Sequence, residues 1–224
     1  MKICYLANNA IPSTVASAIQ IVKMCEALAE NNNEVSLICP DSNKIKKNIF
    51  NFYNIKTKFN IEKLSKFKQF PLGFKYYTFS IESVIKSLKY KPNIYITRNF
   101  FTTFILTLLR KKVILEIHHD IQIESRITKF LINFLKFLNS KNIIRIVAIS
   151  NKVKKYYINT FNIKKNKIIV LPSGSSIKIQ SYLKIKNFRK LNIGYFGSIY
   201  KSRGADIFLS LSKMDKKNNY YLFG

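Results

Sequence analysis

Short apolar runs alternate with longer segments of helical periodicity along most of the chain. An apolar run bounded by turn signals is typical of a buried strand, whereas apolar residues at every third or fourth position are typical of an amphipathic helix. The predicted strands are Lys2–Leu6, Glu34–Cys39, Ile55–Phe59, Asn93–Thr97, Lys112–Ile117, Ile143–Ile149 and Lys167–Leu171. The predicted helices are Ser17–Glu30, Phe74–Leu88, Phe100–Leu109, Ile123–Leu138 and Asn151–Thr160, with Ser150 as the N-cap of the last.

Strands that alternate with helices of this length predict an α/β protein with a doubly wound parallel sheet over residues 1–172. Residues 173–190 are polar, basic and poorly periodic, which is typical of a linker. Residues 191–224 then begin the same plan again, with an apolar strand at Leu191–Phe196, a polar turn, a helix opening at Gly204 and another strand. The sequence therefore predicts one α/β domain followed by the start of a second.

Candidate site residues are those that directly follow the predicted strands, because doubly wound sheets bind ligands at the carboxyl ends of their strands. The turn after Phe196 is the most informative of these places. There, a strand, a glycine and a helix start stand beside Lys201 and Arg203, and this combination predicts a phosphate site. The other places are Asn8–Gln20, Arg98, His118–Asp120 and Ser150.

The charge of the chain is strongly positive. Among 224 residues, 39 are Lys or Arg and 11 are Asp or Glu, so the net charge is +28. Such a surplus attracts phosphates, nucleic acid or anionic lipid. The cations are spread along the whole chain, however, and Lys, Asn and Ile are abundant throughout, as AT-rich coding would produce. Without a clustered basic face or a nucleic-acid motif, no specific nucleic-acid binding is predicted.

The expected environment is a reduced cytoplasm. Cys4, Cys25 and Cys39 lack the spacing of metal ligands or of a redox pair, so we expect small core residues and neither a metal nor a cofactor. No apolar run approaches the roughly 20 residues that span a bilayer. The first residues lead at once into polar Asn8 and Asn9, which is not the pattern of a signal peptide.

Five short motifs, taken in order, resemble those of the family 4 type of glycosyltransferase, which has the two-domain GT-B architecture. Each motif is modest alone, and their common order makes the resemblance specific. They are Lys23–Leu28 with Asn33–Ile38, Glu116-x-His118, Val147–Ser150, Val170–Gly174, and Gly194–Gly204.

The resemblance implies a GT-B N-terminal domain over residues 1–172 and an incomplete second Rossmann-like domain over residues 191–224. It implies the transfer of a sugar, with retention at the anomeric carbon, from a nucleotide-sugar donor to a glycan or lipid-linked acceptor. The setting would be the synthesis of a surface polysaccharide or glycolipid. The family's later donor-site residues, including a pair of glutamates, have no counterpart in this sequence, so the chain alone is expected to be inactive.

The resemblance places the donor diphosphate at the turn after Phe196, where charge builds as the bond to the sugar breaks. Gly197 allows close backbone approach, Gly204 opens the helix, and Arg203 offers a bidentate fork to phosphate. Family members usually carry a cation directly after the glycine, where this chain has Ser198. Arg203, helped by Lys201, is therefore the predicted principal contact. The alternative is an ordinary turn with solvated cations.

The acceptor side is assigned in the same way. His118 matches the family's motif residue near the sugar, where an imidazole bonds a hydroxyl, and the adjacent His119 is the fallback. Both could instead be structural histidines. Glu116 lies on the same strand face as His118 and is a predicted structural anchor. Arg98 either binds an acidic acceptor or pairs with an acid, and the sequence favours neither role.

The first loop departs from the family. Relatives often carry glycines there, whereas this chain has Ala16-Ser17-Ala18, so close backbone approach is not expected. Hydrogen bonds from the side chains of Ser17 and Gln20 to the acceptor are predicted instead.

Other functions stay open at this point: a non-catalytic remnant, a basic nucleic-acid- or anion-binding protein, and a GT-B sugar-nucleotide epimerase. An anionic membrane surface is a further candidate partner. The segment Lys129–Lys141 is predicted to be a helix that either rests on the inner face of the membrane or faces the core. Its apolar side consists of Phe130, Leu131, Phe134, Leu135 and Leu138, with cations around them.

Overall fold

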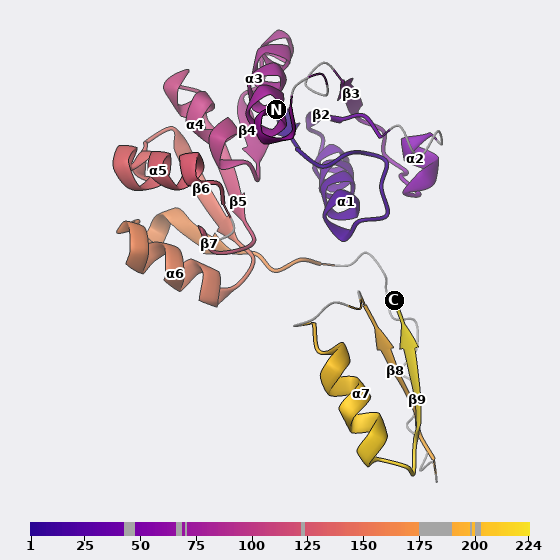
Figure 1. Ribbon diagram of the computed structural model, residues 1–224. Helices are drawn as coiled ribbons and strands as arrows, with labels where there is room; N and C mark the ends of the chain where they lie inside the picture. The colour runs from indigo at the N-terminus through magenta and orange to yellow at the C-terminus, as the bar shows by residue number, and fades with distance from the viewer. Residues whose placement is uncertain are drawn as a thin grey trace. The chain divides into compact units, whose positions relative to one another are not determined.

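The computed structural model describes residues 1–42, 48–65, 69, 71–121, 124–174, 190–197, 199 and 203–224. The chain divides into two compact units, Met1–Gly174 and Ser175–Gly224 (Figure 1). The expected linker at residues 173–190 lies mostly outside the described residues.

A seven-stranded sheet forms the centre of the first unit, in the order β3-β2-β1-β4-β5-β6-β7. All its strand pairs are parallel. The strand order reverses between β1 and β4, and doubly wound sheets bind their ligands at such a switch point. The predicted doubly wound α/β fold is thus confirmed. The strands are β1 (Lys2–Leu6), β2 (Glu34–Pro40), β3 (Asn60–Leu64), β4 (Ile94–Thr97), β5 (Val113–Ile117), β6 (Ile143–Ala148) and β7 (Ile168–Val170).

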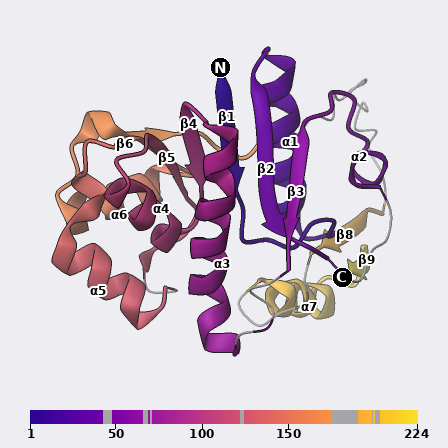
Figure 2. The same cartoon turned by 90° about the horizontal axis from the view of Figure 1, so that it is seen from above.

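Helices cover both faces of this sheet (Figure 2). Helix α1 buries its apolar stripe against one face, together with Ile3 and Leu37, while α3 and α4 pack on the other face with Cys4 and Leu6. Alternate residues of β1 therefore serve opposite layers, as the two-residue period of a strand requires. The helices are α1 (Ala16–Glu30), α2 (Ile49–Phe52), α3 (Leu72–Ser87), α4 (Phe100–Leu108), α5 (Arg126–Leu135) and α6 (Asn151–Phe161).

The sequence prediction was wrong about the third strand. The run Ile55–Phe59 is loop, and β3 follows it at Asn60–Leu64. Ile55 and Phe59 are buried because the loop packs them against the layer of α1, so their apolar character reflects burial of a loop and not a strand. Strand β3 lies at the sheet edge, where its mixed polar sequence is tolerated.

The long helix predicted for residues 123–138 is also shorter than expected. Helix α5 begins at Arg126 and ends at Leu135, Lys136 takes a left-handed conformation with φ 47°, and a short 3₁₀ helix follows. Phe130 is 59 % exposed whereas Leu138 is 1 % exposed, so the predicted single apolar face does not exist. The break at Lys136 turns Leu138 into the core.

The second unit consists of β8 (Asn192–Phe196), α7 (Ala205–Met214) and β9 (Asn219–Phe223). Its two strands pair in parallel, and the Phe208 ring of α7 packs between Tyr195 and Tyr220, with ring centroids 5.7 and 5.4 Å away. A strand, a helix and a parallel strand form the basic unit of Rossmann-like folds. In the described parts of both units, no helix combines the length and the apolar character that crossing a bilayer requires.

Candidate functional site

Polar side chains from three neighbouring strands meet at the carboxyl edge of the sheet. Tyr5 belongs to β1, Arg98 directly follows β4, Glu116 belongs to β5, and His118 comes just after β5. Strands β1, β4 and β5 are neighbours in the parallel sheet, so residues far apart in sequence converge beside the switch point.

Glu116 is the centre of this cluster. Its Oε2 accepts hydrogen bonds from the Tyr5 hydroxyl at 2.9 Å and from Arg98 Nε at 2.8 Å. The same oxygen lies 3.6 Å from His118 Nε2. Glu116 is only 7 % exposed, so these partners replace water around its charge. The residue joins three strands and thus acts as the structural anchor that its place in the sequence predicts.

The surroundings of Glu116 keep it ionised. Burial by itself would raise the pKa of this carboxyl, but the His118 imidazole beside it, the positive charge and hydrogen bond of Arg98, and the hydrogen bond of Tyr5 outweigh burial and hold the pKa below its ordinary value. A carboxylate is therefore present at neutral pH, with a fixed set of donors around it.

This shift predicts how stability depends on pH. Because the folded protein holds the pKa of Glu116 below its unfolded value, the stabilisation is present above the unfolded value and is lost as pH falls through the folded one. Urea denaturation should give a stability advantage of the wild type over Glu116→Gln at about pH 7 that shrinks toward about pH 3. The exposed Glu30→Gln is the matched control. An advantage of Glu116 that stays constant over this range would contradict the prediction.

Arg98 takes the second of its two predicted roles, because it pairs with an acid. Its side chain is 13 % exposed, and its Nη2 is buried without a hydrogen-bond partner among the described residues. A buried donor without a partner costs about 1–3 kcal/mol. Binding of an acidic acceptor by Arg98 stays a prediction. The attraction of Arg98 for such an acceptor is reduced, because Glu116 already neutralises the guanidinium.

The neighbouring His119 has different partners. Its Nδ1 lies 2.8 Å from the carbonyl oxygen of Asp120, and its Nε2 lies 3.5 Å from Glu124 Oε1. Burial raises the pKa of Glu124, against the lowering effect of His119 and Lys129. The two adjacent histidines thus face two different carboxyl groups, and His118 alone belongs to the cluster around Glu116.

Ser17 and Gln20 lie in the first turns of α1, after the loop that leaves β1 at the same edge of the sheet. Ser17 Oγ accepts a hydrogen bond from Asn9 Nδ2 at 2.9 Å, and both Ser17 and Gln20 are half-buried. No side chain caps the start of α1, where the Ala18 backbone N–H donates to the Val15 carbonyl oxygen at 2.9 Å. Contacts of Ser17 and Gln20 with an acceptor stay predictions.

The second unit holds the predicted phosphate turn. Gly204 has φ 86° and precedes α7, whose start is also without a side-chain cap. The carbonyl oxygen of the exposed Arg203 accepts a hydrogen bond from the Tyr195 hydroxyl at 3.1 Å, and Gly197 N donates to Phe223 O at 3.0 Å. The other two predicted residues, Ser198 and Lys201, lie outside the described residues.

The sequence model of Glycosyltransferase Family 4 matches residues 17–177, well over half of the chain. The chain belongs to glycosyltransferase family 4. The matched residues include Arg98, Glu116 and His118 but not Tyr5. No curated protein of similar sequence was found.

Solved structures show the same fold for this family 4 chain. It is similar to a glycosyltransferase from Rickettsia africae, with 16 % sequence identity and a TM-score of 0.63. It is also similar to an Anabaena protein in complex with UDP-glucose, with 12 % identity and a TM-score of 0.62. Both matches cover 99 % of this chain and 60 % of the other chain. It also resembles a UDP-GlcNAc 2-epimerase from Methanocaldococcus jannaschii, with 14 % identity and a TM-score of 0.58. That match covers 99 % of this chain and 65 % of the epimerase chain. The chain thus spans less than two thirds of these structures.

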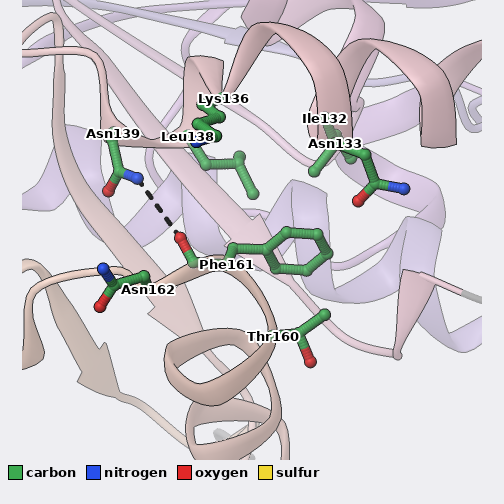
Figure 3. Close-up of a pocket in the computed structure, with 8 residues that line it drawn as sticks. All are labelled: Ile132, Asn133, Lys136, Leu138, Asn139, Thr160, Phe161 and Asn162. Atoms are coloured by element: carbon green, nitrogen blue, oxygen red, sulfur yellow. Dashed lines mark hydrogen bonds between the residues drawn. The ribbon is translucent and has the colours of Figure 1, made fainter.

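A separate cavity of about 280 Å³ in the family 4 chain lies away from the Glu116 cluster. In Figure 3, the Phe161 ring stands between Leu138 and Thr160, and Asn139 donates to the Phe161 carbonyl oxygen at 3.3 Å. Helices of a parallel α/β sheet run back toward the amino ends of the strands. This cavity, at the carboxyl ends of α5 and α6, therefore lies near the amino ends of the strands, whereas the Glu116 cluster lies at their carboxyl ends. Its walls are Ile132, Asn133, Lys136, Leu138, Asn139, Thr160, Phe161 and Asn162.

The described residues offer no group of three or more metal-binding side chains. Cys4, Cys25 and Cys39 are free thiols in the core, as predicted, and burial raises the pKa of each, to about 12 for Cys39. These thiols are therefore unreactive core residues.

Two members of this edge were missed from the sequence. Tyr5 lies within an apolar strand, where a tyrosine is typical of the core, and its partner Glu116 is 111 residues away. Glu124 lies inside what periodicity predicts to be a helix. No local signal identifies Tyr5, since it acquires its partner only when the strands align. Glu124 pairs with His119, five residues earlier in the chain, and lies before α5 rather than inside it.

Proposed function

We propose that this chain is the acceptor-side domain, with the first part of the donor domain, of a retaining glycosyltransferase. The enzyme transfers a sugar from a nucleotide-sugar to a glycan or lipid-linked acceptor during synthesis of a surface polysaccharide or glycolipid. Family membership, together with a prepared polar cluster at the switch-point edge, carries this proposal.

The acceptor side is formed by the residues at the carboxyl edge of the first unit. His118 is the side chain that contacts a sugar hydroxyl, because it is partly exposed, at 26 %, while the buried Glu116 and Arg98 stand behind it. Ser17 and Gln20 add hydrogen bonds from the start of α1. Sugar hydroxyls are both donors and acceptors, and this mixed polar lining suits them.

The donor side is formed by the turn after β8. Arg203 contacts the diphosphate, and the uncapped start of α7 beyond Gly204 presents backbone N–H groups to it. A Cβ atom on Gly197 would make only ordinary contacts with Tyr195, 3.4 Å away, so the glycine leaves room for a ligand. Ser198 and Lys201 complete the proposed turn. The Anabaena structure holds UDP-glucose, which makes UDP-sugars the first donor class to test.

The proposed location is the cytoplasm, at the inner face of the membrane where the acceptor is lipid-linked. The net charge of +28 favours attraction to anionic lipid.

Sugar-nucleotide epimerisation is the second candidate, because two UDP-GlcNAc 2-epimerases share the fold. The two reactions differ in their products. A glycosyltransferase releases the nucleoside diphosphate and lengthens an acceptor, whereas an epimerase returns an altered nucleotide-sugar without any acceptor. The test uses a longer form of the protein that carries a complete second domain, with UDP-sugars, with and without lipid-linked glycans. Mass spectrometry of the products, and the anomeric configuration of a new linkage by NMR, decide between them.

His118→Ala in that longer form should lower kcat/KM by about 10- to 100-fold, the loss of one hydrogen bond to a well-placed group. His119→Ala is the matched control, because His119 pairs with Glu124 outside the cluster, and it should retain activity near that of the wild type. Steady-state kinetics make the comparison. If His119→Ala abolishes activity while His118→Ala is silent, the acceptor-side assignment is wrong.

A further inference from the structure

The His118 ring lies beside a carboxylate that is already held by two other donors. Glu116 Oε2 receives the Tyr5 hydroxyl and Arg98 Nε, and His118 Nε2 is the third group around it, at 3.6 Å. Glu116 has 8 % of its side chain exposed and His118 has 26 %. One ring nitrogen of His118 therefore faces a buried anion, while the side chain as a whole is partly exposed.

We propose that Glu116 is a positioning residue, which fixes the ring proton of neutral His118 on Nε2 and leaves Nδ1 to accept a hydrogen bond from a sugar hydroxyl. This inference rests on the proposed function, because it names the chemical group that the acceptor-side histidine recognises. It assigns to Glu116 an action through His118 and not a contact with the sugar.

The reason is the acceptor-only chemistry of a carboxylate. An ionised carboxyl group has no proton to offer, so a neutral imidazole nitrogen beside it is favourable only when that nitrogen carries the hydrogen. The partner of one ring nitrogen thus sets the role of the other, as for histidines that bind metals. Tyr5 and Arg98 donate to the same oxygen and so keep Glu116 in its accepting form.

This tautomer has a consequence for the substrate. An Nδ1 lone pair pairs with a hydroxyl, which can donate, and not with an ether or phosphate oxygen, which can only accept. His118 would then select a free hydroxyl on the sugar, and methylation of that hydroxyl would remove the contact. Arg98 cannot substitute, because a guanidinium only donates.

The 224-residue chain itself can test the tautomer, since it contains only two histidines. Long-range proton–nitrogen NMR of the nitrogen-15-labelled chain at about pH 9, where histidine side chains are ordinarily neutral, reads which ring nitrogen carries the proton. Loss of a signal set in His118→Gln assigns that set to His118. We expect the wild-type ring to carry its proton on Nε2, with a slowly exchanging Nε2 proton resonance.

Glu116→Gln keeps the shape but offers an amide that can also donate, so the slowly exchanging resonance should be lost and the His118 nitrogen shifts should move toward a tautomer mixture. Arg98→Lys, which keeps the carboxylate, should leave the His118 tautomer as in the wild type. The matched control is Glu124→Gln, which should move the His119 signals and leave those of His118 unchanged.

A wild-type His118 ring with its proton on Nδ1 overturns the proposal without the need for any variant. The proposal is also overturned if the His118 signals of the Glu116→Gln chain are unchanged while its His119 signals match those of the wild type, which shows that the variant is folded. These readouts involve no sugar transfer. An inactive enzyme with the expected tautomer would count against the proposed function alone, and an active one with the wrong tautomer would count against this inference alone.

Discussion

Replacing Arg98 with leucine should destabilise the first unit by about 3–5 kcal/mol, because it leaves the buried charge of Glu116 without its cationic partner. The pair is well enclosed, with 13 % and 8 % of the two side chains exposed, and its atoms are 2.8 Å apart. Removing one member of a buried pair costs far more than removing an exposed ion pair, for which the usual contribution is about 0–1 kcal/mol. Urea denaturation of the 224-residue chain measures the difference.

The double variant Arg98→Leu with Glu116→Leu separates the two possible causes. If the unpaired charge is responsible, removing the carboxylate as well should recover much of the loss, and the free energies of the two single changes should not add. Arg126→Leu, at the exposed start of α5, is the control for replacing an arginine and should stay within about 0.5 kcal/mol of the wild type. If the two single losses in the free energy of unfolding simply add in the double variant, lost packing and not the unpaired charge causes the destabilisation.

The sheet could be predicted because its central strands carry their own signal. Strands buried on both faces are apolar throughout, so β1, β2, β4 and β5 stand out from the polar turns between them. The edge strand β3 lacks this signal, since Asn60–Leu64 is largely polar and only its last residue is fully buried. Periodicity also could not locate the end of α5, because Lys136 adopts a backbone conformation that its side chain does not require.

The candidate site could be predicted only in part, for a related reason. His118 and Arg98 follow strands, so the topology alone places them on the ligand-binding edge. Their partners could not be named, because the pairing of Glu116 with Arg98 depends on the alignment of β4 with β5. The hydroxyl of Tyr5 joins them only because β1 and β4 are neighbours at the switch point.

The scarcity of acidic residues makes these pairings informative. The chain has 11 Asp and Glu against 39 Lys and Arg, so most cations have no carboxylate to pair with. Two of the few carboxylates are nevertheless buried in pairs, Glu26 with Lys23 and Glu116 with Arg98. Glu26 connects α1 to the loop between α2 and β3 by accepting a hydrogen bond from Lys56 N at 2.6 Å. Glu116, in contrast, stands at the ligand-binding edge.

Replacing Arg203 with alanine should lower kcat, because it should remove about 2–4 kcal/mol of transition-state stabilisation. The measurement uses a form of the protein that carries a complete second domain. Negative charge grows on the diphosphate as the bond to the sugar breaks, so a cation fixed there stabilises the transition state more than the bound donor. Turnover should therefore fall more than donor affinity. The backbone of Arg203 is held by the Tyr195 hydroxyl directly before the left-handed Gly204, which fixes the place from which the side chain extends.

The comparison of Arg203→Ala, Arg203→Lys and Lys201→Ala makes this prediction specific. Lysine should recover only part of the activity, because a point charge lacks the two parallel N–H groups with which a guanidinium binds phosphate. Lys201→Ala should have the smaller effect, since Arg203 stands nearer to the start of α7 in the sequence. Steady-state kinetics with a UDP-sugar give kcat and KM for each variant. If Lys201→Ala is the crippling change and Arg203→Ala is nearly silent, the phosphate contact belongs to Lys201, and the assignment of this turn by its resemblance to the family is wrong.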